Sequence, residues 1–521
     1  MTEANGNAYE YFVERHVRDG RGDRLAFADP WRQLTYRELA AASARFAAGL
    51  KAAGVEREQR IALVMLDTVD FPIAFWGAIR AGVVPVPINT LLPSDITGYI
   101  LKDSRAAALV VSAPLLPALR AAARRLKRVV VSSPDGCAGG FADFLAAGGA
   151  DTPAAECSPD EVAFWLYSSG STGNPKGVKH VHASLRATAD TYGRQILEIR
   201  PDDLMFSVAK LFFAYGLGNS LTFPMSVGAA AVLYPDRPTP GAVVATMRQH
   251  RPTMFAGVPT LYAAMLADPE LAPGAGSDRL RRCISAGEPL PEHIGRRWRE
   301  RVGCDILDGL GSTEMLHIFL SNHPDDIRYG TTGKPVPGYD LRVVDADGEA
   351  ADGAPGELVV RGPSAAEGYW NQREKSRHTF RGEWTHTGDT YIRDADGYYR
   401  YCGRSDDMLK VGGIWVSPFE VEEALIGHRT VLEAAVVGQA DSDGLIKPKA
   451  FVVLQATAAN ADPAALIEAL QNHVKAAIGV WKYPRWIEFR DSLPKTATGK
   501  IQRYKLRDPA IVNGGRGRTG G

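Results

Sequence analysis

The sequence has little cysteine, no net charge and no long apolar run. Its 521 residues include five cysteines (Cys137, Cys157, Cys283, Cys304 and Cys402), and no two of them form a C-x-x-C pair. This scarcity disfavours a disulfide scaffold and a thiolate zinc site, and it predicts a reducing compartment, the cytoplasm.

The zero net charge and the lack of long apolar runs disfavour nucleic acid and membranes as partners. Lys plus Arg and Asp plus Glu both total 60, so there is no global positive field to hold nucleic acid or an anionic membrane. No apolar stretch approaches the roughly 20 residues of a membrane-spanning helix. The first residues, MTEANGNAYEYF, lack the charged and apolar regions of a signal peptide. We therefore expect neither nucleic acid nor a membrane as partner.

Short apolar runs alternate with longer segments of helical periodicity. The runs in the first quarter are Ile61–Met65, Val83–Ile88, Ala108–Val111 and Val129–Val131, and Tyr36–Ala52 has apolar residues at helical spacing. Further strand candidates are Ala163–Tyr167, Ala229–Tyr234, Arg282–Ser285 and Asp305–Leu307. This alternation predicts an α/β fold of parallel sheets covered by helices.

The pattern changes after residue 340. Leu341–Val344 and Glu357–Arg361 are predicted strands on either side of a turn at Asp345–Gly348, which indicates a small antiparallel or barrel-like unit. After the polar cluster Gly403–Asp407 the predicted elements are a helix at Pro418–Gly427, strands at Val431–Val437 and Lys449–Leu454, and a helix at Pro463–Ile478. We therefore predict a large N-terminal domain (1–405) of helix-flanked sheets with a barrel-like subdomain, followed by a small mobile α+β domain (406–521).

The segment Tyr167–Gly177, YSSGSTGNPKG, is rich in groups that bind phosphate. It follows the strand-like Val162–Leu166 and precedes a helix predicted from about Ala183. Glycine lets backbone N–H groups approach an anion, Ser and Thr add donors, and Lys176 adds charge. Neither the Walker A spacing nor the nucleophile elbow G-x-S-x-G fits the segment. The alternative is a solvated glycine-serine turn.

This segment resembles the phosphate loop of the adenylate-forming superfamily, which includes acyl- and aryl-CoA ligases, peptide-synthetase adenylation domains and luciferases. Five further segments resemble that superfamily's motifs in the expected order: Ser285–Pro289, Gly309–Glu314, Thr387–Asp389, Gly403–Asp407 and Pro494–Lys500. Leu310 stands where tyrosine is common. The resemblance covers about residues 10 to 507.

The resemblance implies a site for ATP and Mg²⁺. The implied nucleotide-binding residues are Ser168, Ser169, Gly170, Ser171, Thr172, Gly173, Lys176, Ala286, Gly287, Glu288, Pro289, Asp308, Gly309, Leu310, Ser312, Asp389 and Arg404.

Several of these residues suit their implied roles chemically. Thr313 offers a hydroxyl to the α-phosphate, and Glu314 offers the hard oxygen that Mg²⁺ prefers. The Asp389 carboxylate is an acceptor for ribose hydroxyls. Read in isolation, Glu314 is an exposed loop acid, Asp389 is a turn residue, and Arg404 is a partner of a nearby surface acid.

The implied reaction joins two anions, a carboxylate and the α-phosphate of ATP, so donors and cations must surround the developing charge. By resemblance, Lys500 is the catalytic lysine of adenylation, although its polar loop alone indicates only a solvated side chain. Asp406 is the implied hinge about which the small domain rotates, so that a thiol reaches the adenylate beside Gly412 and Gly413.

Two segments, Ala209–Gly218 and Gly311–Ile318, resemble benzoate–CoA ligases most closely. That family implies a ring pocket formed by Ala214, Tyr215, Gly309, Gly311, His317 and Ile318. Small residues would leave a flat slot, and His317 could face the carboxylate. The alternatives are ordinary core packing for Tyr215 and a satisfied core histidine for His317.

The implied thiol acceptor is free coenzyme A, because no carrier-protein domain is expected after Lys500. Trp481, Lys482 and Arg485 are candidate coenzyme A contacts; the alternative is a helix-end cluster that packs on its own domain. An apolar pocket rejects an added polar group only weakly, by about 10²-fold or less. Hydroxybenzoate, fluorobenzoate and 2-aminobenzoate therefore stay open as the acid, as do a carrier-protein partner and a homodimer.

Overall fold

The chain forms two compact units. The computed structural model describes residues 5–124, 126–149, 153–168, 174–268, 271, 277–345, 348–404, 407–411, 414–442, 444–455, 458, 462–495 and 501–507. The larger unit comprises Met1–Leu341 and Val360–His386, and the smaller comprises Arg342–Val359 and Thr387–Gly521. Each unit is described separately below.

The first sheet of the larger unit is parallel, as the sequence predicts. Its order is β4-β3-β5-β6, with bounds β3 (Arg60–Val64), β4 (Val84–Pro87), β5 (Ala108–Ser112) and β6 (Arg128–Ser132). Helices α3 (Asp70–Arg80), α4 (Ser94–Asp103) and α5 (Leu116–Ala123) follow its strands, with a 3₁₀ turn, η2 (Ala113–Leu115), before α5. The Val-rich strands are buried because helices cover a parallel sheet.

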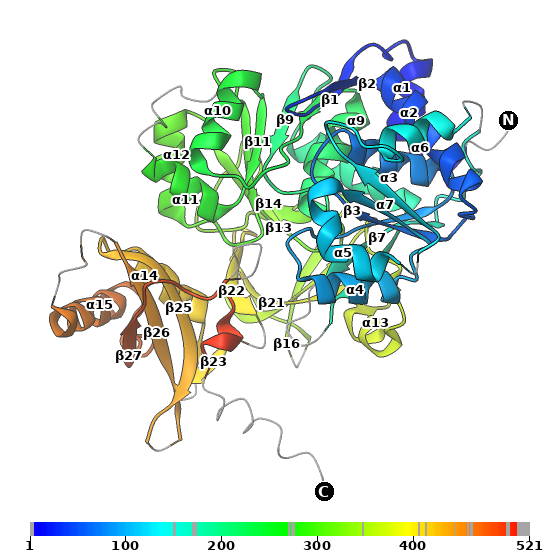
Figure 1. The fold of residues 1–521 in the computed structure, drawn as a ribbon. Coiled ribbons are helices and arrows are strands. Elements are labelled where there is room, and N and C mark those ends of the chain that lie inside the picture. The colour runs from blue at the N-terminus through cyan, green and yellow to red at the C-terminus, as the bar shows by residue number, and fades with distance from the viewer. Residues whose placement is uncertain are drawn as a thin grey trace, which may run out of the picture. The chain divides into compact units, whose positions relative to one another are not determined.

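A nine-stranded sheet forms the centre of the larger unit. Its order is β15 (Lys334–Pro335), β14 (Ile318–Ser321), β13 (Ile306–Gly311), β12 (Arg282–Ala286), β11 (Met254–Gly257), β9 (Leu204–Ser207), β10 (Ala230–Val232), β1 (Leu25–Ala28) and β2 (Gln33–Thr35). Helices α10 (Pro240–His250), α11 (Pro259–Ala267) and α12 (Glu292–Val302) lie together beside β11 (Figure 1). Their apolar side chains, among them Met247, Tyr262 and Trp298, form one core with Phe206 and Phe255 of the sheet.

The third sheet carries the glycine-rich segment and differs from expectation. Its order is β19 (Gly368–Tyr369), β8 (Lys176–Val181) and β7 (Val162–Ser168), and both pairings are antiparallel. The sequence predicts β7 and a helix from about Ala183, but it does not predict the strand β8 that lies between them. The turn therefore joins two antiparallel strands, and α7 (His182–Thr188) begins only after β8.

Local signals explain the best-predicted helix. Helix α2 (Tyr36–Ala52) has the predicted bounds and begins with a capping box, in which Thr35 and Glu38 bond to each other's backbone N–H. The remaining helices of the larger unit are α1 (Arg15–Arg18), α6 (Phe141–Ala147), α8 (Ala214–Leu217), α9 (Phe223–Val227), α13 (Arg373–Thr379) and the π-helices η1 (Glu10–Glu14), η3 (Ala189–Ile196) and η4 (Gly218–Thr222). No helix in the part of the chain that the structure describes is long and apolar enough to span a membrane.

The unit expected after residue 340 is a six-stranded sheet. Its members are β16 (Asp340–Asp345), β17 (Gly348–Glu349), β18 (Pro355–Arg361), β20 (Phe380–Arg381), β21 (Trp384–Arg393) and β22 (Tyr399–Arg404). The pairs β16–β17, β20–β21 and β21–β22 are antiparallel.

The segment after residue 406, which lies wholly in the smaller unit, is α+β, as predicted. The hairpin β23 (Leu409–Val411) and β24 (Ile414–Val416) precedes α14 (Pro418–Ile426), β25 (Val431–Ala440), β26 (Ile446–Leu454), α15 (Pro463–Ile478), β27 (Trp486–Phe489) and the 3₁₀ turn η6 (Arg503–Lys505). Helices α14 and α15 pack Leu425 and Leu470 against Val436 and Val452 of the sheet.

Candidate active site

A single carboxylate, that of Glu314, collects hydroxyl donors from two other segments. Ser168 Oγ donates to Glu314 Oε1 at 3.2 Å, and the Tyr369 hydroxyl donates to the same oxygen at 2.8 Å. Lys176 Nζ lies 4.1 Å from the centre of the Tyr369 ring. The carboxylate is therefore held in place but half-buried, so its remaining oxygen can accept another ligand.

Strand pairing explains this convergence. In the antiparallel pair β7–β8, Ser168 lies opposite Lys176, so the two ends of the glycine-rich turn are held side by side. Strand β19 pairs with the other edge of β8 and places Tyr369 opposite Val178. The sequence could not predict this contact, because 55 residues separate Tyr369 from Glu314.

The turn that carries Thr313 and Glu314 is fixed by a buried histidine. His180 Nε2 lies 2.8 Å from the backbone oxygen of Thr313, and burial lowers the pKa of His180 to about 4. The imidazole is therefore neutral at pH 7 and bonds to this carbonyl as an Nε2–H donor. His180 is a positioning residue that the motifs did not reveal.

The segments implied on the adenine side lie in neighbouring strands. Strands β12 and β13 are parallel, with Ser285 opposite Asp308 and Ala286 opposite Gly309. Gly287 then turns the chain with φ of +94°, a conformation that favours glycine. The Asp308 carboxyl is buried, Leu290 N–H donates to it at 3.4 Å, and burial raises its pKa to about 8. The structure thus brings the 285–290 loop and the 308–311 strand together.

The implied ring pocket is built around His317. Its ring centroid lies 4.5 Å from that of Phe223 and 5.2 Å from that of Tyr192, and burial lowers its pKa to about 3. A Cβ on Gly218 would lie 2.3 Å from His317 Cδ2, so only glycine leaves room for the imidazole. His317 is therefore neutral and brings no charge to the pocket, and its Nε2 lies 3.3 Å from the Tyr215 backbone oxygen, an acceptor for its one N–H.

Tyr215, expected to form an apolar wall of the pocket, is also held in place by hydrogen bonds. Its hydroxyl is 3.0 Å from the backbone oxygens of both Gly257 and Ile284, and its own backbone oxygen lies 3.3 Å from His317 Nε2. A Cβ on Gly309 would lie 2.8 Å from Ile318 Cγ2, which explains a small residue there. The structure brings Tyr215, Gly309, His317 and Ile318 together, with Ala214 next to Tyr215 and Gly311 opposite Ile318.

The smaller unit carries a separate group of implied residues. Asp389 and Arg404 are opposite each other in β21 and β22, and Arg404 donates to Asp389 Oδ1 and to the Thr387 backbone oxygen, both at 3.1 Å. Gly388 has φ of +70°, and a Cβ there would lie 2.7 Å from the Arg404 guanidinium. Both the positive φ and the nearby Arg404 guanidinium therefore require glycine at position 388.

The implied coenzyme A contacts are already partly occupied. Trp481 is 60% exposed, whereas both carboxylate oxygens of Glu420 bind Lys482 Nζ, at 2.6 and 2.7 Å. The Arg485 guanidinium carbon lies 3.6 Å from the centre of the Tyr483 ring. These contacts fit the alternative of a packed helix-end cluster as well as a ligand site.

Several predicted residues lie outside the described part of the chain: Ser169, Gly170, Ser171, Thr172, Gly173, Asp406, Gly412, Gly413 and Lys500. The residues flanking Lys500 are well tied. Lys495 forms a β-bridge with Ile501, and Gln502 N–H donates to the Pro494 backbone oxygen at 2.8 Å.

Comparison with known proteins decides the family. Residues 13–370 match the AMP-binding enzyme family, and residues 420–500 match the AMP-binding enzyme C-terminal domain. The chain belongs to the AMP-binding enzyme family.

Two relatives of this AMP-binding enzyme are named as CoA ligases of benzoate or 4-hydroxybenzoate. It is 56% identical to a 4-hydroxybenzoate–CoA/benzoate–CoA ligase of Rhodopseudomonas palustris over 97% of this chain and 94% of that one. It is 54% identical to a benzoate–CoA ligase of Thauera aromatica over 96% and 95% of the two chains.

Two solved structures are similar to this AMP-binding enzyme over nearly their whole length. A benzoate CoA ligase from Burkholderia xenovorans aligns with a TM-score of 0.89 at 50% identity, covering 97% of this chain and 100% of that one. An anthranilate CoA ligase in complex with anthranoyl-AMP aligns with a TM-score of 0.91 at 42% identity, covering 98% of both. The fold class and the family predicted from the sequence are therefore confirmed.

The donor set of this AMP-binding enzyme fits a magnesium nucleotide. Within the described residues there is no group of three or more His, Cys, Asp or Glu that could hold a metal by itself. Mg²⁺ commonly uses one or two carboxylates and takes its other ligands from phosphates and water. Glu314, fixed by two hydroxyls on one oxygen, supplies such a carboxylate next to the glycine-rich turn.

Proposed function

We propose that this AMP-binding enzyme is an ATP-dependent aryl-CoA ligase. It converts benzoate or a close ring-substituted benzoate to the acyl-adenylate, transfers the acyl group to coenzyme A, and releases pyrophosphate and AMP. The observation that carries the proposal is that one short segment contributes to two sites, the proposed magnesium-nucleotide site and the proposed acid pocket. Glu314 faces the hydroxyl cluster at the glycine-rich turn, and three residues later His317 lies in a cage of aromatic rings.

The first half-reaction needs charge neutralisation. A carboxylate oxygen attacks the α-phosphorus, and the bond from that phosphorus to the bridging oxygen of pyrophosphate breaks. A bound Mg²⁺ would lower the repulsion between the two anions as a Lewis acid. In this proposal Glu314 holds the metal, Thr313 and the glycine-rich turn bind phosphate oxygens, and Lys500 stabilises the developing charge.

The second half-reaction needs access for a thiol. The sulfur of coenzyme A attacks the acyl carbon, and AMP leaves with the bonding electron pair. We propose that residues 406–521 rotate as one domain about Asp406, relative to residues 1–405, and that the thiol passes Gly412 and Gly413. Trp481, Lys482 and Arg485 are proposed to contact the nucleotide end of coenzyme A. The cytoplasm as location and a homodimer as assembly are likewise proposals.

The acid pocket supports an aromatic ring more strongly than any one ring substituent. Glycine at Gly218 and Gly309 leaves room for His317 and Ile318, and neither position has space for a Cβ. A pocket of this apolar kind discriminates only weakly against a small added group. Hydroxybenzoate and 2-aminobenzoate are therefore the alternative acids, and a carrier-protein thiol is the alternative acceptor.

The decisive experiment is ATP–pyrophosphate exchange and AMP release with a panel of aromatic and aliphatic acids, with free coenzyme A or a phosphopantetheinylated carrier protein as acceptor. We expect exchange with benzoate-type acids and turnover with free coenzyme A. Lys500→Ala should lose exchange but still form the thioester from a supplied benzoyl-adenylate. Exchange with fatty acids alone would overturn the choice of acid, and equal loss of both half-reactions in Lys500→Ala would overturn the role of the lysine.

A further inference from the structure

A cavity of about 440 Å³ opens on the larger unit, and none of its lining residues is among the candidate active-site residues. It is bounded by the end of α1, the stretch between η3 and β9, and the end of α9. Its lining residues are Arg15, Arg21, Arg194, Glu198, Ile199, Pro201, Ser226 and Val227.

Arg15 brings a positive charge to this cavity without a carboxylate to balance it. Its guanidinium lies 3.7 Å from the centre of the Tyr11 ring and donates to the Ser226 backbone oxygen. Among the described residues no carboxylate lies within ion-pair distance of Arg15, and its buried Nε has no hydrogen-bond partner. Burial lowers the pKa of Arg15, and the neighbouring positive charge of Arg21 lowers it further.

The other two arginines are only partly neutralised. Arg21 bonds to the Asp19 carboxylate at 2.9 Å, but within the described structure its buried Nε has no partner. Arg194 lies 3.4 Å from Asp190, a carboxylate that Arg186 also binds at 3.0 Å. The arginines of the cavity therefore carry more positive charge than the carboxylates bound to them balance, and an anion would complete the pairing.

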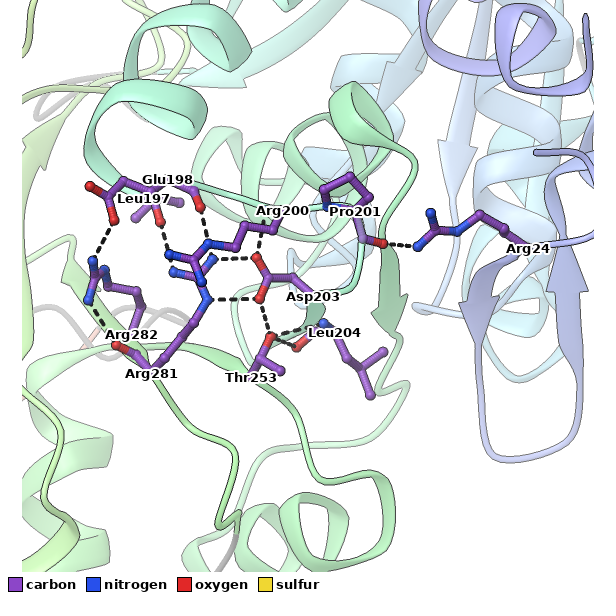
Figure 2. A network of polar contacts seen from close by, with 10 residues as sticks. All are labelled: Arg24, Leu197, Glu198, Arg200, Pro201, Asp203, Leu204, Thr253, Arg281 and Arg282. Carbon is purple, nitrogen blue, oxygen red and sulfur yellow. Dashed lines mark hydrogen bonds and ion pairs between the residues drawn. The ribbon is translucent and has the colours of Figure 1, made fainter. Parts of the chain in front are cut away.

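The one carboxylate among the lining residues is committed elsewhere. Glu198 Oε2 lies 2.7 Å from the guanidinium of Arg282 (Figure 2), which is not one of the lining residues. The backbone oxygens of Glu198 and Leu197 accept hydrogen bonds from Arg281 at 2.9 and 3.4 Å. These acceptors therefore bind Arg281 and Arg282, although the buried Arg282 Nε has no partner among the described residues.

The wall that carries Glu198 is also held rigidly from behind. The buried Asp203 carboxylate binds Arg281 through two nitrogens, one of them Nε at 2.9 Å, and accepts from the Thr253 hydroxyl at 2.7 Å (Figure 2). Arg24 donates to the Pro201 backbone oxygen. The wall is thus fixed by bonds that lie outside the cavity, so a ligand would meet a preformed site.

We propose that this cavity is an anion site for a phosphate group, either free or as the monoester of a small metabolite. Arginine pairs with phosphate oxygens through two parallel N–H bonds, and such charge-assisted bonds are the strongest class in proteins. The apolar lining at Ile199 and Val227 would contact the organic part of a monoester.

A second basic cavity differs from this one in how its arginines are bound. Its volume is about 420 Å³, and it is lined by Gln59, Arg60, Arg105, Ala106, Ala107 and Lys127. There Arg60 donates to the backbone oxygens of Ser104 and Glu58, at 2.8 and 3.1 Å, and the arginines cover the Trp370 ring. The arginines of that cavity are therefore held by backbone oxygens and by an aromatic ring.

The test is calorimetric titration of the full-length protein at constant ionic strength, with inorganic phosphate and ribose 5-phosphate as probes. We expect saturable binding to the natural chain and at least about tenfold weaker binding to the double variant Arg21→Gln/Arg194→Gln. The matched control is Arg297→Gln, which removes an exposed arginine from α12 and should bind like the natural chain. The tighter probe identifies the source of the phosphate group.

Two results would overturn the proposal: no saturation by either probe, or equal binding to all three proteins. Phosphate bound at the glycine-rich turn is separated by this design, because it would persist unchanged in the double variant. Circular dichroism and AMP release in phosphate-free buffer verify that the variant is folded. If the double variant unfolds, the single variants Arg21→Gln and Arg194→Gln carry the same comparison.

Discussion

At the scale of single residues, His317 shows how burial decides chemistry. The imidazole lies against Phe223 and Tyr192, and burial lowers its pKa to about 3. A protonated histidine would attract a carboxylate more strongly, but it would also hold the substrate as an ion pair in the ground state. A neutral imidazole forms no ion pair, which would leave a substrate carboxylate free to act as a nucleophile.

Gly218→Ala tests the space that His317 needs. The new Cβ would lie 2.3 Å from His317 Cδ2 and 2.9 Å from Phe223 Cζ, so the imidazole must move. We expect the KM for benzoate to rise at least about tenfold, with overpacking that costs about 1–3 kcal/mol of stability. Steady-state AMP release and thermal unfolding measure both effects. The control is Gly241→Ala in α10, where a Cβ meets nothing within 4 Å. An unchanged KM in Gly218→Ala would remove His317 from the acid pocket.

Tyr369→Phe tests whether the hydroxyl on Glu314 orients a metal-binding carboxylate. The Tyr369 hydroxyl donates to Glu314 Oε1 at 2.8 Å, and removing it frees the carboxylate to rotate. We expect kcat/KM for MgATP to fall about three- to tenfold and the Mg²⁺ concentration for half-maximal rate to rise. Titration of the rate with Mg²⁺ at fixed ATP measures this.

The matched control for Tyr369→Phe is Tyr329→Phe. The Tyr329 hydroxyl donates to the Asp305 carboxylate at the same distance, 2.8 Å, but outside the candidate site. Tyr329→Phe should leave the Mg²⁺ dependence unchanged. An equal change in both variants would show that the effect is general destabilisation.

At the scale of elements, helices with complete local signals are predicted best. Helices α2 and α15 have the predicted bounds, because apolar periodicity coincides with an N-cap, Thr35 in one and Asp462 in the other. The π-helix η3 and the strand β8 were missed. A π-helix departs from the 3.6-residue period on which helix prediction depends, and β8 has Lys176, Lys179 and His180 among its six residues, so it contains no apolar run.

The candidate site follows the same division. The motifs predicted Ser168, Glu314 and His317, because each lies in a contiguous pattern. Tyr369 and His180 could not be predicted, because their roles depend on strand pairing and on a contact across 133 residues. The resemblance therefore gave the groups that are predicted to touch ligands, whereas the groups that hold Glu314 and Thr313 in place came from the fold.

The element that follows Lys500 is tied to α14 by a buried ion pair. Glu422 accepts from Arg503 Nε at 3.0 Å and from Val436 N–H at 2.7 Å, and burial raises its pKa. Arg503→Met leaves this carboxylate buried without its cation, so we expect the smaller unit to lose about 3–5 kcal/mol. Urea unfolding followed by circular dichroism measures the loss.

Two companions make the ion-pair prediction specific. Glu422→Gln/Arg503→Met keeps the acceptor for Val436 but removes the charge, so it should be more stable than Arg503→Met alone. Arg490→Met breaks the exposed pair with Glu488 and should cost less than about 1 kcal/mol. If Arg503→Met costs no more than Arg490→Met, Arg503 does not anchor the segment after Lys500.

At the scale of the whole molecule, buried titratable groups set the response to acid. Burial lowers the pKa of His16, His180 and His182 to about 4 and that of His317 to about 3. Each histidine therefore stabilises the fold above its unfolded pKa of about 6.5, and this stability is lost as the pH falls. Burial acts oppositely on two acids of the larger unit, raising the pKa of Asp67 to about 6 and that of Asp308 to about 8. Their contribution is present below the unfolded pKa of about 4 and is lost as the pH rises.

The histidines and the acids have opposite effects on the pH dependence of stability. These effects do not cancel, because there are four histidines and two acids. Near pH 5 the unfolded chain holds about two more protons at these sites than the folded chain, so stability should fall by about 2–3 kcal/mol per pH unit on acidification. Urea unfolding followed by tryptophan fluorescence between pH 7 and pH 5 measures the slope. His182→Gln should reduce it by about 1.4 kcal/mol per pH unit, because the side chain no longer takes up a proton on unfolding. His378→Gln should not change it, because that side chain is exposed before and after unfolding. A flat profile, or equal slopes in His182→Gln and the natural chain, would mean that the buried histidines do not control acid unfolding.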